Sequence, residues 1–149
     1  MDKRRRVIKK TFYYSIQWTW GILMNLIGLG AFIVAKIKKW PIEKYRNATA
    51  IYHPTLCGGM SLGLFLIIGK GCKKRTASHE YGHSIQNMQW GPLMIFVIGI
   101  PTLIRYCYRK LKYNKKNLAP PANKYEEVWF EKQATEYGRR AVSNIWSLF

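Results

Sequence analysis

Two long stretches without a charged side chain constrain the fold of this chain more than any other feature. They cover residues 16–35 and 47–69. As a helix, each is long enough to cross the roughly 30 Å of hydrocarbon in a lipid bilayer. The sequence therefore predicts an all-α integral membrane protein in which two transmembrane helices, over about residues 16–35 and 47–69, form a hairpin.

Basic residues gather at the ends of both stretches, where they would meet lipid headgroups. The chain has 25 lysines and arginines against 7 acidic residues, a net charge of +18. Such a charge also suits a nucleic-acid-binding protein, but no recognition motif accompanies it. We therefore expect a lipid bilayer with anionic headgroups as the partner of the basic segments, and no nucleic acid. The basic arm before the first stretch predicts an uncleaved anchor with its amino terminus in the cytoplasm.

The segment His79-Glu80-Tyr81-Gly82-His83 predicts a zinc site on a helix. Residues four apart lie on one helical face, so His79 and His83 can bind the same ion. Glu80 projects beside them, where it can act as the general base of a hydrolytic reaction, most often of a peptide bond. We expect this helix over about residues 78–90, because proline after Gly91 disfavours helical geometry in the glycine.

Residues 92–104 form a third apolar segment, which Pro101 interrupts. The segment is short for a full crossing, so it resembles a re-entrant segment. The alternative is a third transmembrane span over residues 84–104, which would carry the rest of the chain to the opposite side. A last helix is expected over about residues 124–146, after a proline-rich turn. All these elements belong to a single domain, residues 1–149.

A catalytic zinc ion usually takes a third protein ligand, and the C-terminal helix offers several glutamates for this position. Glu131 is the best candidate, because on a helical wheel it shares a face with small and apolar residues that can pack against the helix of the two histidines. Another class of zinc peptidase has a third histidine six residues after the second, but Gln89 stands there. His53, near the start of the second span, is the remaining histidine. The other glutamates of the C-terminal helix are Glu126, Glu127 and Glu136.

The two motifs together resemble a known family. HEYGH, followed after about fifty residues by Glu131-Lys132-Gln133-Ala134-Thr135, is similar to the gluzincin peptidases of the membrane-bound CAAX prenyl protease type and their bacterial heat-shock relatives. The resemblance implies His79, His83 and Glu131 as zinc ligands and Glu80 as general base. Thr135 stands where the family has an aspartate that supports a motif histidine. The short chain implies either a minimal member of the family or a member that depends on a partner, and we expect this partner to be a second copy of the chain or another subunit.

The functional hypothesis is a membrane-embedded zinc-dependent endopeptidase that hydrolyses membrane-associated peptides or proteins. If Glu131 binds the same ion as the histidines, both ends of the third apolar segment lie on one side of the bilayer. This favours re-entry and a site that faces the cytoplasm, at a prokaryotic cytoplasmic membrane. Tyr137, Arg139 and His53 are candidate contacts for the oxyanion or the substrate. The alternative is a non-enzymatic, basic integral membrane protein, an accessory or scaffold subunit, whose HEYGH segment holds a structural metal or none.

Overall fold

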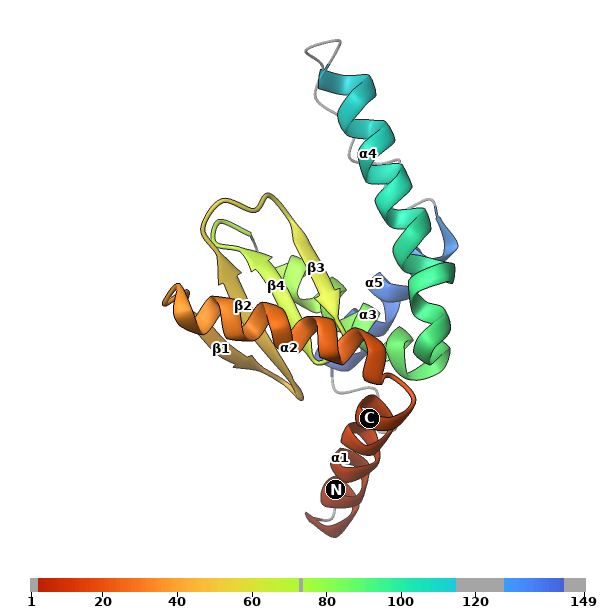
Figure 1. Ribbon diagram of the computed structural model, residues 1–149. Helices are drawn as coiled ribbons and strands as arrows, with labels where there is room; N and C mark the ends of the chain where they lie inside the picture. Colours follow the sequence, from red (N-terminus) through yellow and green to blue (C-terminus); the bar gives the residue numbers. More distant parts are fainter. Residues whose placement is uncertain (1–2, 73, 115–127, 144–149) are drawn as a thin grey trace.

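The computed structural model describes residues 3–72, 74–114 and 128–143. In this part of the chain, helices and strands combine into a mixed α/β fold (Figure 1). A 3-10 turn (Gly91–Leu93) and a π-helical segment (Ile95–Gly99) connect the third helix to the fourth. The other elements are α1 (Lys3–Thr19), α2 (Ile22–Ile37), β1 (Ile42–Tyr45), β2 (Ala48–His53), β3 (Gly59–Leu62), β4 (Phe65–Gly69), α3 (Lys74–Trp90), α4 (Ile100–Asn114) and α5 (Trp129–Val142).

The four strands form one sheet in the order β1-β2-β4-β3. β2 runs parallel to β4, whereas β1 pairs antiparallel with β2 and β3 pairs antiparallel with β4. Helix α2 covers one face of the sheet, where Ile51 and Phe65 are buried. Helix α3 covers the other face, where Leu66 and Ile68 pack with Tyr81. Because both faces are covered, β4 is almost entirely buried, and half of the residues of β2 are buried.

The predicted all-α membrane fold is wrong, because residues 47–69 are not a transmembrane helix. They contain β2, β3 and β4. A strand that is buried on both faces is apolar throughout, so its hydrophobicity resembles that of a membrane-spanning helix. Gly63 has a backbone conformation that a helix does not contain. Its φ is 66° in the tight turn between β3 and β4, and the side chain of Asn25 lies against it. A side chain at this position would be strained and would overlap with Asn25.

The first predicted span is also wrong, because residues 16–35 are divided between two helices. The break lies between Thr19 and Ile22, and α1 and α2 meet there at 90°. Buried amide side chains donate hydrogen bonds to backbone carbonyl groups at this break. Asn25 Nδ2 donates to the carbonyl oxygens of Gln17 (2.5 Å) and Gly21 (3.1 Å), and Asn87 Nδ2 also donates to that of Gly21 (3.2 Å). Polar residues inside the apolar stretch thus stabilise a corner.

Within the described residues, no single helix is both long enough and apolar enough to cross a membrane. Two consecutive pairs reach that length and composition only together, and they bend by 90° and 114° at their breaks. The segment 92–104, predicted to re-enter the membrane, comprises most of the 3-10 turn, the π-helical segment and the start of α4. Helix α3 begins before the predicted residue 78, and α5 lies inside the predicted range 124–146. Residues 124–127 and 144–146 are outside the described residues.

Candidate metal centre

Helices α3 and α5 cross at very close range on the face of α3 that points away from the sheet. Gly82 of α3 lies against the backbone of Ala134, and Gly138 of α5 lies against the backbone of Ser78. A β-carbon at either glycine would overlap with the backbone of the opposite helix. The two glycines therefore permit a crossing that brings the first turn of α5 to the histidine face of α3.

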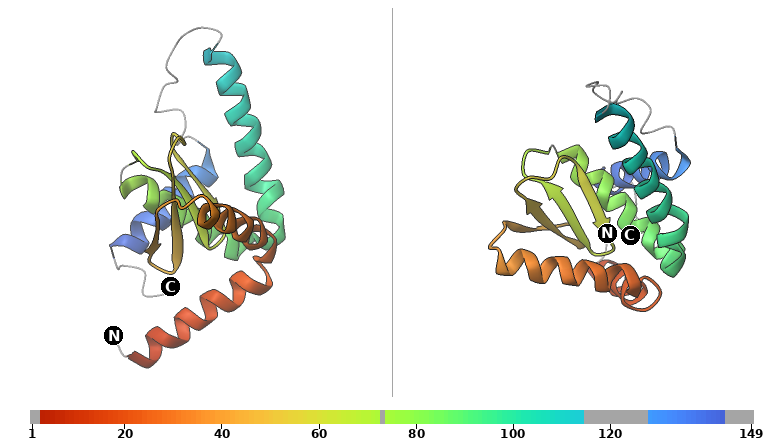
Figure 2. Two further views of the ribbon diagram at one scale, coloured as in Figure 1. Left: turned by 60° about the vertical axis from the view of Figure 1, so that its left-hand side comes forward. Right: turned by 45° about the horizontal axis from the view of Figure 1, so that its top comes forward.

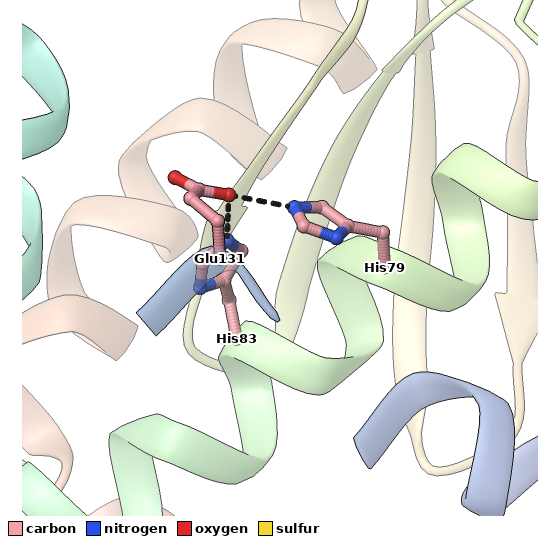
Figure 3. Close-up of side chains that lie close together, drawn as sticks. All are labelled: His79, His83 and Glu131. Atoms are coloured by element: carbon pink, nitrogen blue, oxygen red, sulfur yellow. Dashed lines mark hydrogen bonds and ion pairs between the residues drawn. The ribbon is translucent and has the colours of Figure 1, made fainter. Parts of the chain in front are cut away.

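This crossing brings His79, His83 and Glu131 together (Figure 3). Oε2 of Glu131 lies 3.0 Å from Nε2 of His79 and 3.4 Å from Nε2 of His83. Each residue contributes one possible ligand atom, and these three atoms all lie within 4.8 Å of one another. A tetrahedral ion about 2.1 Å from its ligands separates neighbouring ligand atoms by about 3.4 Å. The spacing therefore fits an ion, and these three residues can hold a metal.

A neighbouring side chain holds the second ring nitrogen of each histidine. Nδ1 of His79 lies 2.8 Å from Oγ1 of Thr135, and Nδ1 of His83 lies 2.7 Å from Oε1 of Gln86. The amide nitrogen of Gln86 donates to the Phe130 carbonyl (2.9 Å) and to Gln133 (2.8 Å), so its oxygen accepts the Nδ1–H of His83. Such contacts fix the ring orientation of metal-binding histidines and leave Nε2 for the metal.

The charges of the three residues are strongly coupled. Burial by itself raises the pKa of Glu131, but hydrogen bonds from His79 and His83 lower that pKa to about 2. Burial by itself lowers the pKa of His83, yet the hydrogen bond to Glu131 and the negative charge of Glu80 raise this pKa above its ordinary value. The raised pKa of His83 favours its protonated form, whose positive charge Glu131 attracts.

Glu80 lies beside this group, between α3 and the edge strand β3. Its side chain is only 6% exposed and packs against Gly59, where a β-carbon would overlap with its carboxyl group. Burial raises the pKa of Glu80; the charges of His83 and His79 oppose this shift, and that of Glu131 adds to it. A raised pKa makes the carboxylate a stronger proton acceptor near neutral pH.

The remaining predicted contacts do not converge with the three candidate ligands. His53 belongs to the turn after β2: its Nδ1 accepts hydrogen bonds from the backbone of Thr55 (3.2 Å) and Leu56 (3.1 Å). The hydroxyl of Tyr137 lies 2.9 Å from the amide nitrogen of Gln89, which donates to it. Arg139 is exposed and lines a cleft of about 1120 Å³ that reaches His79. Three further basic residues, Lys74, Arg75 and Lys132, line the same cleft.

Several residues that support the group were not predicted from the sequence. Gln86 has a local signal, because it follows His83 by three positions and so lies on the same helical face. Thr135 also has a local signal, because it follows Glu131 by four positions and so lies on the same helical face. Gly59 and Thr102, whose Oγ1 lies 3.5 Å from Oε1 of Glu131, have no such signal, because they come from other parts of the fold.

Comparison with known proteins does not assign the chain to a family. It matches no protein-family model, no curated protein and no solved structure. The resemblance to gluzincin peptidases therefore stays a prediction that depends on the HEYGH segment and the Glu131 motif.

Proposed function

We propose that the protein is a zinc-dependent peptidase. The convergence of His79, His83 and Glu131 is the observation that carries this proposal. Two imidazole nitrogens and one carboxylate oxygen suit zinc, and three protein ligands leave a position for water or substrate. A structural zinc site would instead be closed by a fourth protein ligand, and the described residues near the group supply none. The ligand set therefore supports a catalytic role.

The chemistry of the site is divided between the ion and the chain. A bound zinc ion would lower the pKa of a water molecule and polarise the scissile carbonyl group. Glu80 accepts a proton from the attacking water, and its raised pKa suits this task. It then delivers the proton to the amine of the leaving peptide, which completes the hydrolysis. Thr135 and Gln86 hold the histidines in place throughout.

The cleft that His79 and Thr135 line offers a substrate an approach to the first candidate ligand. Its volume of about 1120 Å³ exceeds the roughly 300–1,000 Å³ of common small-molecule sites. An open cleft of this size suits a segment of peptide chain better than a single metabolite. We expect the substrates to be peptides or proteins that are associated with membranes.

The direct test is the zinc content of the purified protein after loosely bound ions have been removed. We expect about one zinc ion per chain in the wild type, and loss of the ion in His79→Ala and in Glu131→Gln. Glu136→Gln is the matched control, because Glu136 lies on the same helix but pairs with Arg140. Zinc that persists in Glu131→Gln would contradict the ligand set. A wild type without zinc would contradict the proposal and favour a non-enzymatic accessory protein.

A second variant separates metal binding from catalysis. Glu80→Gln should keep its zinc but lose peptide hydrolysis by about 100-fold or more, because the amide cannot accept the proton. Mass spectrometry of a mixed peptide library would measure the hydrolysis without knowledge of the cleavage sequence. Glu43→Gln, on the exposed side of β1, should behave as the wild type. Full hydrolysis by Glu80→Gln would exclude Glu80 as the general base.

A further inference from the structure

One face of α2 is apolar and exposed along most of the helix. The opposite face, with Met24, Gly28 and Ala35, is buried against the rest of the protein. The exposed side chains recur every three or four residues, as expected for one side of a helix. They are 41–75% exposed and comprise Leu23, Leu26, Ile27, Ile33, Val34 and Ile37.

A second exposed apolar face follows the turns before α4 and continues along this helix. Helix α4 extends away from the sheet and from the pair formed by α3 and α5 (Figures 1 and 2). In Figure 1, α2 and α4 both lie toward the viewer, in front of α3 and α5. The side chains of this second face are 42–66% exposed and comprise Leu93, Phe96, Ile100, Leu103, Ile104 and Leu111.

The segments that contain these faces carry positive charge and no negative charge. Residues 3–42 and 81–125 include no aspartate or glutamate. Exposed lysines, Lys36, Lys38 and Lys39, stand at the end of α2. The sequence of α4 contains Arg105, Arg109, Lys110 and Lys112. Apolar helical faces with basic neighbours match a bilayer, which offers hydrocarbon below and anionic headgroups at its surface.

A second copy of the chain fits these faces less well. Two copies that met here would bring together surfaces that are both basic, in a protein with a net charge of +18. This arrangement would be repulsive, whereas anionic lipids neutralise the same charge. Charge complementarity therefore selects the lipid surface as the occupant.

We propose that the exposed faces of α2 and α4 form a docking surface for a bilayer that contains anionic lipids. The two helices lie along the bilayer surface, with the apolar side chains in the hydrocarbon and the basic side chains among the headgroups. This arrangement differs from a transmembrane hairpin, because the helices lie in the membrane surface instead of crossing it.

Helix α4 connects the docking surface to the candidate metal centre. Oγ1 of Thr102 in α4 lies 3.5 Å from Oε1 of Glu131, and the next two residues, Leu103 and Ile104, belong to the docking surface. Docking would therefore bring the metal centre next to the bilayer, where lipid-anchored or membrane-inserted peptides are concentrated. This last step depends on the proposed peptidase function, but docking itself does not.

Flotation with lipid vesicles tests the proposal. We expect the full-length protein to float with vesicles of phosphatidylcholine and phosphatidylglycerol, and to bind pure phosphatidylcholine at least about tenfold more weakly. Leu26→Glu with Ile33→Glu in α2, and Leu103→Glu with Ile104→Glu in α4, should each weaken binding about tenfold or more. Val142→Glu is the matched control, because Val142 is an exposed apolar residue of α5 outside the docking surface. It should bind as the wild type.

Three outcomes would contradict the proposal of a docking surface. These are a wild type that binds neither kind of vesicle, double variants that bind as well as Val142→Glu, and a soluble wild-type dimer that the double variants convert to monomers. Circular dichroism would verify that each variant is folded. The zinc content of the same samples keeps the two proposals apart. Vesicle binding without zinc would contradict only the peptidase, and zinc without vesicle binding would contradict only the docking surface.

Discussion

Oγ1 of Thr135 lies 2.8 Å from Nδ1 of His79, close enough to accept the hydrogen of this ring nitrogen. The gluzincin pattern has an aspartate at this position, so a neutral hydroxyl takes the place of a carboxylate. Threonine can orient the ring as an aspartate does, but it adds no negative charge to a site that already contains Glu80 and Glu131. The site therefore depends on hydrogen-bond geometry more than on charge to support its first histidine.

Thr135→Val should weaken zinc binding by about 10–100-fold, since valine keeps the shape of threonine but cannot accept the hydrogen bond. Thr135→Ser keeps the hydroxyl and should retain most of the affinity. Competition with a chromogenic chelator measures both values. Equal affinities in the valine and serine variants would show that the contact with His79 does not contribute to metal binding.

Gln86→Leu should affect both the metal site and the fold. The substitution leaves Nδ1 of His83 without its partner, which costs about 1–3 kcal/mol, and it also removes the hydrogen bond from Gln86 to the carbonyl of Phe130. We also expect zinc affinity to fall about 10–100-fold. Gln133→Leu removes only the outer contact of Gln86, so it should leave zinc affinity close to that of the wild type. Chemical denaturation and chelator competition measure the two effects separately.

The candidate metal ligands could be predicted because their signals are local. Four residues separate His79 from His83, which places both on one face of any helix. Glu131 differs from the other three glutamates in that small and apolar residues share its helical face, and Ala134, Gly138 and Ala141 of this face are buried. The support of the histidines is only partly local, since Thr135 comes from the opposite helix.

The fold could not be predicted by the same reasoning, because its causes lie far apart in the sequence. β4 is apolar on both faces, since α2 covers one side and α3 the other, and neither contact is visible in the run of residues 65–69. The corner between α1 and α2 depends on Asn87, which follows Gly21 by 66 positions. The hydrophobicity of these residues therefore resembles that of membrane-spanning helices, although the chain forms strands and a bend there.

The metal-free protein should have a stability maximum at mildly acidic pH. The pKa of Glu131 is lowered to about 2, so its contribution is present above the ordinary value of about 4.3 and is lost as the pH falls toward 2. The pKa of His83 is raised, so its contribution is present below about 6.5 and is lost as the pH rises through the folded value. Both contributions are complete only between roughly pH 4.3 and 6.5.

Thermal unfolding in the presence of a chelator tests this pH profile. Glu131→Gln should remove the maximum, because an amide does not titrate and does not raise the pKa of His83. Zinc binding should show the opposite dependence and weaken as the pH falls, since His83 must lose its proton to bind the ion. A maximum that persists in Glu131→Gln would assign the effect to other groups.

The close crossing of α3 and α5 gives the sharpest test of how the fold builds the site. Gly138→Ala places a β-carbon into the backbone of Ser78, so the helices must separate. We expect a loss of about 1–3 kcal/mol in the free energy of unfolding, and weaker zinc binding because Glu131 moves away from His79 and His83. Gly30→Ala is the matched control: a β-carbon there has no atom within 4 Å, and alanine stabilises a helix by up to about 1 kcal/mol relative to glycine. Chemical denaturation and zinc titration of both variants measure the effects. If Gly138→Ala retained both stability and zinc affinity, the site would not depend on the glycine-mediated crossing.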